Sequence, residues 1–437
     1  MGFLNNDKLI VGYDLGNKYC QISYALSEGR EPETLSQVAG AQNYNIPAVL
    51  CKRYGTNQWL YGREALRCAD GQEGILVENL VSLAMDGETV MIDGESFDPV
   101  ALLALFFKKS LGLLAQVSSR IHALMVTCSV LDRRILEVLT HIVESIQLRV
   151  NRVAVQSYAE SFYCYMLRQP WELRIYPSVL FEYRQGGIRV LRMESNKRTT
   201  PIVVFVEESR YQFLEYAFGE GYGPEGEDSP VELGQEQKEM LDAAFLRIAE
   251  EVCGGETLGS IYLIGDGFGE DWMKYSLRYL CKGRRVFQGN NLFSKGACIG
   301  MQERLLPGES GKAYVFLGND KLRANIGMKI LRQGEESYYA LLDAGVNWYE
   351  AERTLEVYIQ DGNELALLIT PLIHSASGNG GRSVGIALEG LSGNIARLRL
   401  HFFLKEENCL SVEVQDLGFG EFRVSAGKVW KEEIPIY

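Results

Sequence analysis

The sequence has few histidines and no closely spaced cysteines. Its four His residues are dispersed, and its nine Cys residues stand singly, with no Cys-X-X-Cys pair: Cys20, Cys51, Cys68, Cys128, Cys164, Cys253, Cys281, Cys298 and Cys409. Metal sites built from His and Cys need these residues at short, regular spacing. The pattern therefore argues against such a site. An odd, unpatterned set of thiols indicates reduced core cysteines rather than disulfides.

An excess of positive charge is also missing. The formal net charge is −13, with 57 acidic against 44 basic residues, and no stripe rich in Lys and Arg stands out. Nucleic acids and anionic membranes are bound through basic patches, so we expect neither as a partner. The N-terminus lacks a basic segment followed by an apolar run, and we identify no apolar stretch of membrane-spanning length. The expected compartment is therefore the cytoplasm.

Apolar residues, by contrast, are plentiful enough for large cores. Hydrophobic residues make up 46% of the 437 residues and charged residues 23%, which is typical of globular proteins. A chain of this length exceeds one core, so we expect two or three domains. Strand-like and helical segments alternate through the first two-thirds, which favours an α/β architecture. After about residue 308, short alternating segments predict an all-β domain, most simply a sandwich.

Residues 9–23 combine two apolar segments with a tight turn between them. They predict a strand, a turn and a second strand, with Asp14 and the backbone around Gly16, Asn17 and Lys18 at the tip. The N–H groups of such a turn suit phosphate oxygens, and a carboxylate there can hold Mg²⁺ through water. Asp and Gly are equally common in ordinary hairpin turns. This segment alone leaves both interpretations open.

Two later segments extend the pattern. Residues 179–193 repeat the design of apolar residues around a Gly-containing turn, which indicates two related half-domains. Residues 260–269 predict a buried strand that ends in a Gly-rich turn containing Gly265, Asp266 and Gly267, before a helix over 272–282. A strand that leads into a Gly-rich turn and a helix start is a natural place for a nucleotide.

Further elements follow from periodicity and capping. A helix should begin after Asp98-Pro99, because Asp caps helices and Pro favours their first turn. The acidic, Gly- and Pro-rich residues 219–234 predict an exposed loop. The remaining predictions are strands over 122–128, 152–155, 355–359, 384–388, 398–404 and 410–414, and helices over 131–147, 158–167 and 236–252.

Taken in order, these segments resemble the 70 kDa heat-shock chaperone (DnaK-type) family, within the superfamily of actin, sugar kinases and these chaperones. VGYDLGNKYC is similar to the family's first phosphate motif, and MVTCSVLDRR with VAVQSYAESFYCYML to its strand, helix and connecting helix. LIGDGFGEDWMKYSLRYL resembles the adenosine motif and LFSKGACIGM the closing helix. ALEGLSGNIARLRLHFFLKEENCLSVEVQD is similar to the peptide-binding β-domain. The resemblance spans almost the whole chain.

The resemblance implies an actin-like, two-lobed α/β domain over 1–305 with a shortened second lobe, a linker over 306–319, and a β-sandwich over 320–437 without a helical lid. ATP or ADP with Mg²⁺ would lie between the lobes, with Asp14 as the metal-binding residue. The implied nucleotide-binding residues are Asp14, Gly16, Asn17, Lys18, Glu182, Gly186, Gly187, Gly265, Asp266 and Gly267. The sandwich would bind proteins or extended peptide segments.

In the last third of the chain, the sequence allows two interpretations for one segment and two for a set of aromatic residues. Residues 314–317 fit a coupling linker and equally the first strand of the sandwich. Tyr338, Tyr339 and Trp348 fit either the lining of a peptide groove or ordinary packing.

Several positions depart from the family's pattern. In the second phosphate motif, Glu182 replaces the leading Asp and Gly187 the Thr, while the remaining changes are Arg184 and Gln185 at two Gly positions and Arg189 at a second Asp. Ser157 stands where the connecting helix has a metal-organising Glu, and Leu80 aligns with the catalytic Lys. Phosphoryl transfer depends on positioned charge around the γ-phosphate. Loss of these groups predicts that hydrolysis is crippled.

The function expected from this combination is a chaperone-like pseudoenzyme that binds proteins or peptides. One alternative is a divergent but working ATPase chaperone, in which Asp14 positions Mg²⁺ and Glu182 substitutes for the lost Asp. A filament-forming actin relative is less favoured, because a β-domain follows. A sugar or acetate kinase is least favoured, because no acceptor-binding motif is present and the catalytic carboxylates are altered.

Overall fold

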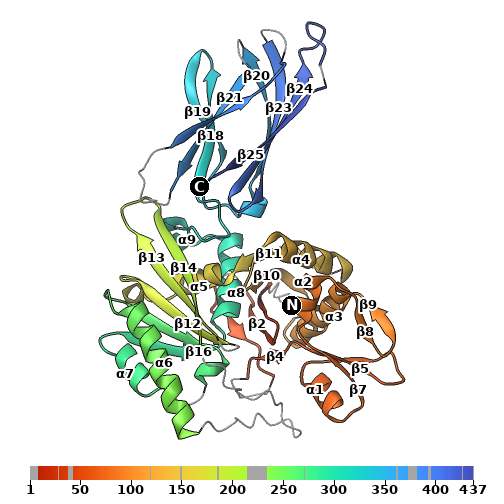
Figure 1. The fold of residues 1–437 in the computed structure, drawn as a ribbon, viewed down its shortest axis with the longest axis vertical. Coiled ribbons are helices and arrows are strands. Elements are labelled where there is room, and N and C mark those ends of the chain that lie inside the picture. The colour runs from red at the N-terminus through yellow and green to blue at the C-terminus, as the bar shows by residue number, and fades with distance from the viewer. Residues whose placement is uncertain are drawn as a thin grey trace, which may run out of the picture. The chain divides into compact units, whose positions relative to one another are not determined.

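The chain folds into a mixed α/β unit followed by an all-β unit (Figure 1). The computed structural model describes residues 8–27, 29–37, 43–118, 120–147, 150–184, 187–213, 234–269, 271–360, 363–372, 381–391, 395–425 and 427–436. The two compact units are Met1–Tyr314 and Val315–Tyr437. Most of the predicted loop 219–234 lies outside the described residues, as does Gly186.

Two sheets of the first unit repeat one strand order. The first runs β11 (Arg152–Ser157), β10 (Ile121–Cys128), β1 (Leu9–Leu15), β2 (Tyr19–Ala25) and β3 (Glu33–Thr34), with β4 (Ile46–Pro47) beside β2. The second runs β16 (Arg285–Gly289), β15 (Ser260–Ile264), β12 (Ser178–Arg184), β13 (Gly187–Asn196), β14 (Ile202–Gln212) and β17 (Tyr314–Phe316). Within each, the three chain-consecutive strands pair antiparallel and the two later ones parallel. The repeat read from two hairpins therefore extends to whole sheets.

The helices follow the same repeat. The first half carries α3 (Pro99–Leu111), α4 (Arg133–Ser145) and α5 (Tyr158–Leu167), and the second half carries α6 (Gln235–Cys253), α7 (Tyr275–Leu280) and α8 (Leu292–Leu305). Helix α7 is shorter than predicted, because Trp272 is buried and its Nε1 donates to the Gly267 carbonyl, 2.8 Å away. The first half also contains α1 (Gly62–Asp70), α2 (Leu80–Asp86), β5 (Leu50–Arg53), β6 (Trp59–Tyr61), β7 (Gly74–Val77), β8 (Val90–Ile92) and β9 (Glu95–Phe97).

Helices α5 and α8 lie between the two halves and pack against each other (Figure 1). A Cβ added at Gly296 of α8 would lie 2.0 Å from the Ser161 carbonyl oxygen of α5, so glycine permits this crossing. Helix α8 also covers the first sheet, where a Cβ at Gly12 would lie 2.2 Å from the Ser294 carbonyl oxygen. In turn, Phe162 of α5 meets Tyr262 of β15 edge to face, with 5.8 Å between ring centroids. The last helix of each half therefore packs on the sheet of the other.

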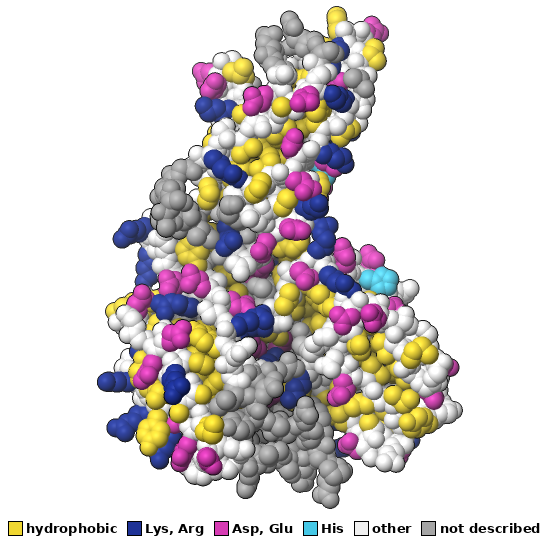
Figure 2. All heavy atoms as spheres, in the orientation of Figure 1, with side chains coloured by type: hydrophobic (Ala, Val, Ile, Leu, Met, Phe, Trp, Pro, Cys, Tyr) yellow, Lys and Arg dark blue, Asp and Glu magenta, His cyan; other side chains and the backbone are white. Residues whose placement is uncertain are grey.

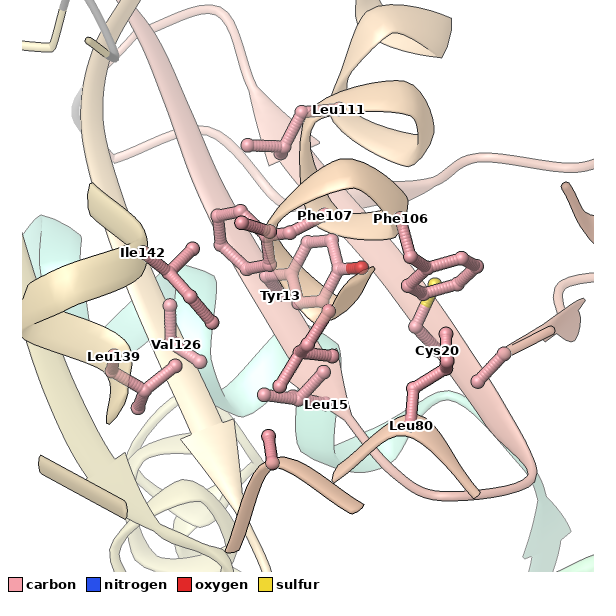
Figure 3. Packing of buried hydrophobic residues seen from close by; sticks show 14 of the residues in the cluster. Tyr13, Leu15, Cys20, Leu80, Phe106, Phe107, Leu111, Val126, Leu139 and Ile142 are labelled. Atoms are coloured by element: carbon pink, nitrogen blue, oxygen red, sulfur yellow. The ribbon is translucent and has the colours of Figure 1, made fainter. Parts of the chain in front are cut away.

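Helix α3 fills the centre of the first half. Its side chains Phe106, Phe107 and Leu111 meet Tyr13 and Leu15 of β1 in the core (Figure 3). With the following 3₁₀ turn, residues 99–116 are long and apolar enough to cross a membrane, and half of that stretch is buried inside the unit. The expectation of no apolar stretch of spanning length was therefore wrong by length and composition. This stretch is apolar because α3 packs against α2, α4 and β6 and buries side chains in the core of the first half.

The second unit contains two antiparallel four-stranded sheets. One has the order β19 (Glu335–Leu342), β18 (Ala324–Arg332), β21 (Glu364–Pro371), β22 (Arg382–Ala387). The other has the order β20 (Glu352–Gln360), β23 (Ile395–Glu406), β24 (Cys409–Gly418), β25 (Val429–Pro435). The predicted one-sided face of β23 is confirmed, since alternate residues are buried: Leu398, Leu400, Phe402 and Leu404. Each of the four strands predicted for this part of the chain is present.

Residues 306–319, the expected linker, contain helix α9 (Glu309–Ala313) and strand β17. Neither four-stranded sheet of the second unit includes β17 among its described strands. Tyr338, Tyr339 and Trp348 were predicted either to line a peptide groove or to pack ordinarily. Trp348 is buried. The ring of Tyr338 lies against Gly327, and the Tyr339 hydroxyl accepts from Arg353 Nη2 at 3.1 Å. Tyr338 is nevertheless half exposed, so the choice between groove lining and packing stays untested for the two tyrosines.

Candidate functional site

Asp14 lies at the end of β1, where the two halves of the first unit meet. Its side chain is buried, and the Tyr158 hydroxyl at the start of α5 donates to Asp14 Oδ1 at 2.5 Å. From the other half, Arg184 at the end of β12 places Nη2 3.8 Å from Asp14 Oδ2. The predicted phosphate hairpins thus do face each other, and an ion pair joins them.

Arg184 is one member of a row of alternating charges on the second sheet. Glu182 Oε1 lies 3.0 Å from Arg184 Nε, and Glu182 Oε2 lies 3.3 Å from Arg189 Nε. Glu208 Oε1 lies 3.6 Å from Arg189 Nε and 2.7 Å from Arg210 Nε. Strand register explains the row, because Glu182 pairs with Arg189 across β12 and β13, and Arg189 with Arg210 across β13 and β14. We call this set, with Asp14, the ion-pair row.

Tyr158 is held between the two halves by its ring. The ring stacks on Phe293 of α8, with 3.9 Å between centroids and an interplanar angle of 12°. The guanidinium carbon of Arg189 lies 5.3 Å from the ring centroid, a cation–π distance. These contacts fix the hydroxyl that bonds Asp14.

Burial and the neighbouring charge of Arg184 shift the pKa of Asp14 in opposite directions. Burial raises the pKa of Asp14 to about 6, while Arg184 and the Tyr158 hydrogen bond act in the lowering direction. Burial also raises the pKa of Tyr158 well above its ordinary value. For Arg184, burial acts to lower the pKa, but Glu182, Tyr158 and Asp14 outweigh it and the net direction is upward. The guanidinium therefore stays charged, and burial brings the pKa of Asp14 towards neutral pH.

Substituting Asp14→Asn should reveal this titration. A carboxyl whose pKa is higher in the folded than in the unfolded state contributes stability below its unfolded pKa and loses it as the pH rises through the folded pKa. A rise to about 6 makes wild type lose about 2 kcal/mol between pH 4 and pH 7 through this residue. The variant lacks that loss, so its unfolding free energy relative to wild type should rise by that amount. Urea titrations at both pH values measure it, and a difference independent of pH would contradict the assignment.

The hairpin tip uses its polar groups internally. The Gly16 N–H donates to the Tyr19 carbonyl at 3.2 Å, as in an ordinary turn. Asn17 donates to Ser82 Oγ at 2.5 Å and accepts from the Ser82 N–H at 2.9 Å. Lys18 is exposed, with Nζ 5.4 Å from the Tyr19 ring centroid. These contacts hold the tip in a hairpin turn, and its part in nucleotide binding stays a prediction.

The Gly-rich turn after β15 is explained by packing. Gly265 has φ +99°, and a Cβ there would lie 2.3 Å from the Tyr183 carbonyl oxygen. A Cβ at Gly267 would lie 2.1 Å from the Tyr183 ring. Asp266 Oδ1 accepts from Asn45 Nδ2 at 3.1 Å, and Asn45 Oδ1 accepts from Gln21 Nε2 at 2.6 Å. Asp266 is thereby a second polar link between the halves.

The remaining predicted positions have structural roles. Gly187 pairs with Arg184 in the β12–β13 hairpin. Leu80 is fully buried in the core near Leu15 and Phe106 (Figure 3), and so offers nothing to the site. Ser157 caps α5 by accepting from the Glu160 N–H at 3.1 Å.

Sequence reasoning missed several site residues. It did not single out Tyr158, which directly follows Ser157, nor the polar partners Gln21, Asn45, Glu208 and Arg210. The one sequence feature that could have indicated Tyr158 was its position at the start of the predicted connecting helix.

Across the described ranges, no group of three or more His, Cys, Asp or Glu side chains is arranged to hold a metal ion. On the face seen in Figure 2, acidic and basic side chains are interspersed.

Two models of protein families match this chain. A family model described as "Family of unknown function (DUF5716) C-terminal" matches residues 31–319, more than half of the chain. The chain belongs to the DUF5716 family. The matched region includes most of the ion-pair row but not Asp14. A second model, "Domain of unknown function (DUF8552)", matches residues 321–436 of this DUF5716 member. No curated protein matches the chain.

Proposed function

We propose that this DUF5716 member is an actin-like, chaperone-related pseudoenzyme that binds proteins or extended peptide segments and does not hydrolyse ATP. One observation carries the proposal. The Arg184 guanidinium lies 3.8 Å from Asp14 and 3.0 Å from Glu182, the two carboxylates expected at the ends of the phosphate hairpins. A fixed cation of the protein thus neutralises the groups that a catalytic metal would need.

The actin-like part of the proposal is supported by the internal repeat. Both halves have the same strand order, and their hairpins meet at the site. An actin-like domain of two lobes around a shared cleft is built in this way. The second unit supports the β-sandwich part, since each of its sheets buries one face, as alternating strands predict.

The pseudoenzyme part follows from electrostatics. A divalent cation beside Asp14 would lie close to the Arg184 guanidinium, and like charges in a buried site repel strongly. The side chains that would position the γ-phosphate and its attacking water are replaced by a core Leu80 and a capping Ser157. Phosphoryl transfer gains its rate from positioned charge, so these residues supply little of it.

The test combines nucleotide binding with turnover on the full chain. Isothermal titration with ATP and MgCl₂, alongside a phosphate-release assay, should give no turnover above that of the Asp14→Ala variant. Equal background in both proteins would identify the phosphate release as a contaminant. Turnover in wild type that Asp14→Ala abolishes would instead establish the divergent working ATPase, with Glu182 in place of the family's Asp.

Peptide binding is measured on the same preparation. Fluorescence anisotropy of a labelled, extended apolar heptapeptide should report binding that saturating ATP with Mg²⁺ leaves unchanged. No binding of such peptides to the full chain would contradict the protein-binding role.

A further inference from the structure

A small pocket of aromatic and aliphatic side chains lies in the first unit and shares no residue with the ion-pair row. Its walls come from α5, β13, β14 and the loop that precedes β12. The lining residues that matter below are Tyr163, Arg174, Tyr176, Glu194 and Tyr314. Its cavity volume is about 30 Å³, room for one or two water-sized groups.

Arg174 brings an unbalanced cation to this pocket. Its guanidinium carbon lies 5.7 Å from the Tyr314 ring centroid. Its Nε and Nη1 atoms are buried and have no hydrogen-bond partner, and no carboxylate among the described residues forms an ion pair with it. A buried donor left unpaired is destabilising. A charge kept in an apolar pocket at this cost indicates that a counter-ion belongs there.

The acidic residue that lines the pocket is already engaged. Glu194 lines the pocket, and its Oε1 accepts from Arg192 Nε at 2.6 Å. Arg192 in turn pairs with Glu256, 2.6 Å from its Nη2. Among the described residues that line the pocket, no acidic side chain is thus left to balance Arg174.

The loop that carries Arg174 is held in place from both sides. Lys197 Nζ donates to the Ile175 carbonyl at 2.8 Å, and the Gly259 N–H donates to the Pro177 carbonyl at 2.9 Å. Ser178 Oγ donates to the Leu173 carbonyl at 3.2 Å. A site whose backbone is already fixed loses little entropy when a ligand binds.

We propose that this pocket binds a carboxylate of a protein segment in which the acidic group neighbours apolar residues. A carboxylate fits the small cavity and pairs with the planar guanidinium fork, giving Nε or Nη1 the acceptor it lacks. Two large aromatic side chains at this loop offer contacts for the apolar neighbours, since Trp171 is 63% and Tyr176 51% exposed. The carboxylate comes from an acidic side chain or from a chain terminus.

Labelled peptides and fluorescence anisotropy test the proposal in the absence of nucleotide. The first probe is a blocked pentapeptide with one Glu between two Phe residues, the second its Gln counterpart, and the third a Phe-rich peptide with a free terminal carboxylate. We expect the first or third probe to bind at least tenfold more tightly than the second. Arg174→Gln should abolish that preference and Arg174→Lys should weaken it. Arg198→Gln, which alters an exposed arginine outside the pocket, should retain it.

A melting curve separates binding from a purely structural role. Removing an unbalanced cation should leave the melting temperature of Arg174→Gln equal to or above that of wild type. Equal affinity for the Glu and Gln peptides with no terminal preference, or a melting temperature several degrees lower, would overturn the proposal. Because the pocket and the ion-pair row share no residues, either proposal stands if the other fails.

Discussion

Replacing Arg184 by alanine is expected to lower the free energy of unfolding by about 2–4 kcal/mol at pH 7. The substitution leaves Asp14 and Glu182, which are 2% and 3% exposed, without the cation that lies between them. Breaking a buried pair is costly because the remaining charges stay desolvated. The arginine is itself 28% exposed, so water enters and the loss falls short of a fully buried pair. The pKa of Asp14 should rise further, because Arg184 is the largest influence that lowers it.

Urea denaturation measures this loss, with Arg210→Ala as the matched control. Arg210 belongs to the same ion-pair row, but its side chain is 61% exposed and its described ion pair is with Glu208. Exposed pairs contribute less than about 1 kcal/mol. In the double variant Asp14→Asn with Arg184→Ala, the loss should be smaller than for Arg184→Ala alone, because the buried carboxylate that the arginine neutralised is then absent. An Arg184→Ala protein as stable as the control variant would show that the pair is not coupled to folding.

Substituting Gly296→Ala is expected to destabilise the first unit by about 3 kcal/mol or more, at the upper end for overpacked cores. The new methyl group would lie 2.0 Å from the Ser161 carbonyl oxygen, which is backbone and cannot rotate away. Helices α5 and α8 must then separate, and contacts of α8 with the first sheet separate with them. The effect should appear as a lower urea midpoint with an unchanged slope.

Gly112→Ala is the matched control for that substitution. Gly112 has a right-handed helical backbone with φ −59°, and a Cβ there meets no atom within 4 Å. Alanine at such a position stabilises by about 0.4–1 kcal/mol, because it restricts the unfolded chain. If the two variants changed stability in the same direction by similar amounts, the close crossing of α5 and α8 would not matter for the fold.

Local signals predicted the elements well. Helix α5 begins and ends where the sequence indicated, because Ser157 is a capping residue that accepts from the third helical N–H. Strand β23 shows its alternation in the sequence itself, since one face is buried and the other exposed. Capping and period depend only on neighbours along the chain, and a single sequence contains both.

The site depends on information that a single sequence lacks. The partner of Asp14 at Arg184 follows from how two sheets face each other, and no spacing in the chain records that distance. Gly265 and Gly267 were predicted from the sequence to line a nucleotide site, and the structure adds that each makes room for Tyr183. A glycine in the sequence shows that a position has no side chain, but it does not show which atom approaches the backbone there. The same limit hid Tyr158, whose hydroxyl meets Asp14 only after α5 is in place.

The exchange of α5 and α8 between the halves affects how the protein is made in the cell. One face of the first sheet, including Ile10, Ala123 and Met125, packs against Ala297 and Met301 of α8. Helix α8 ends at Leu305, so a ribosome must synthesise nearly the whole first unit before that face is covered. Domains otherwise fold as they emerge, N-terminal parts first. The nascent chain therefore exposes this apolar face of the sheet until α8 has been synthesised.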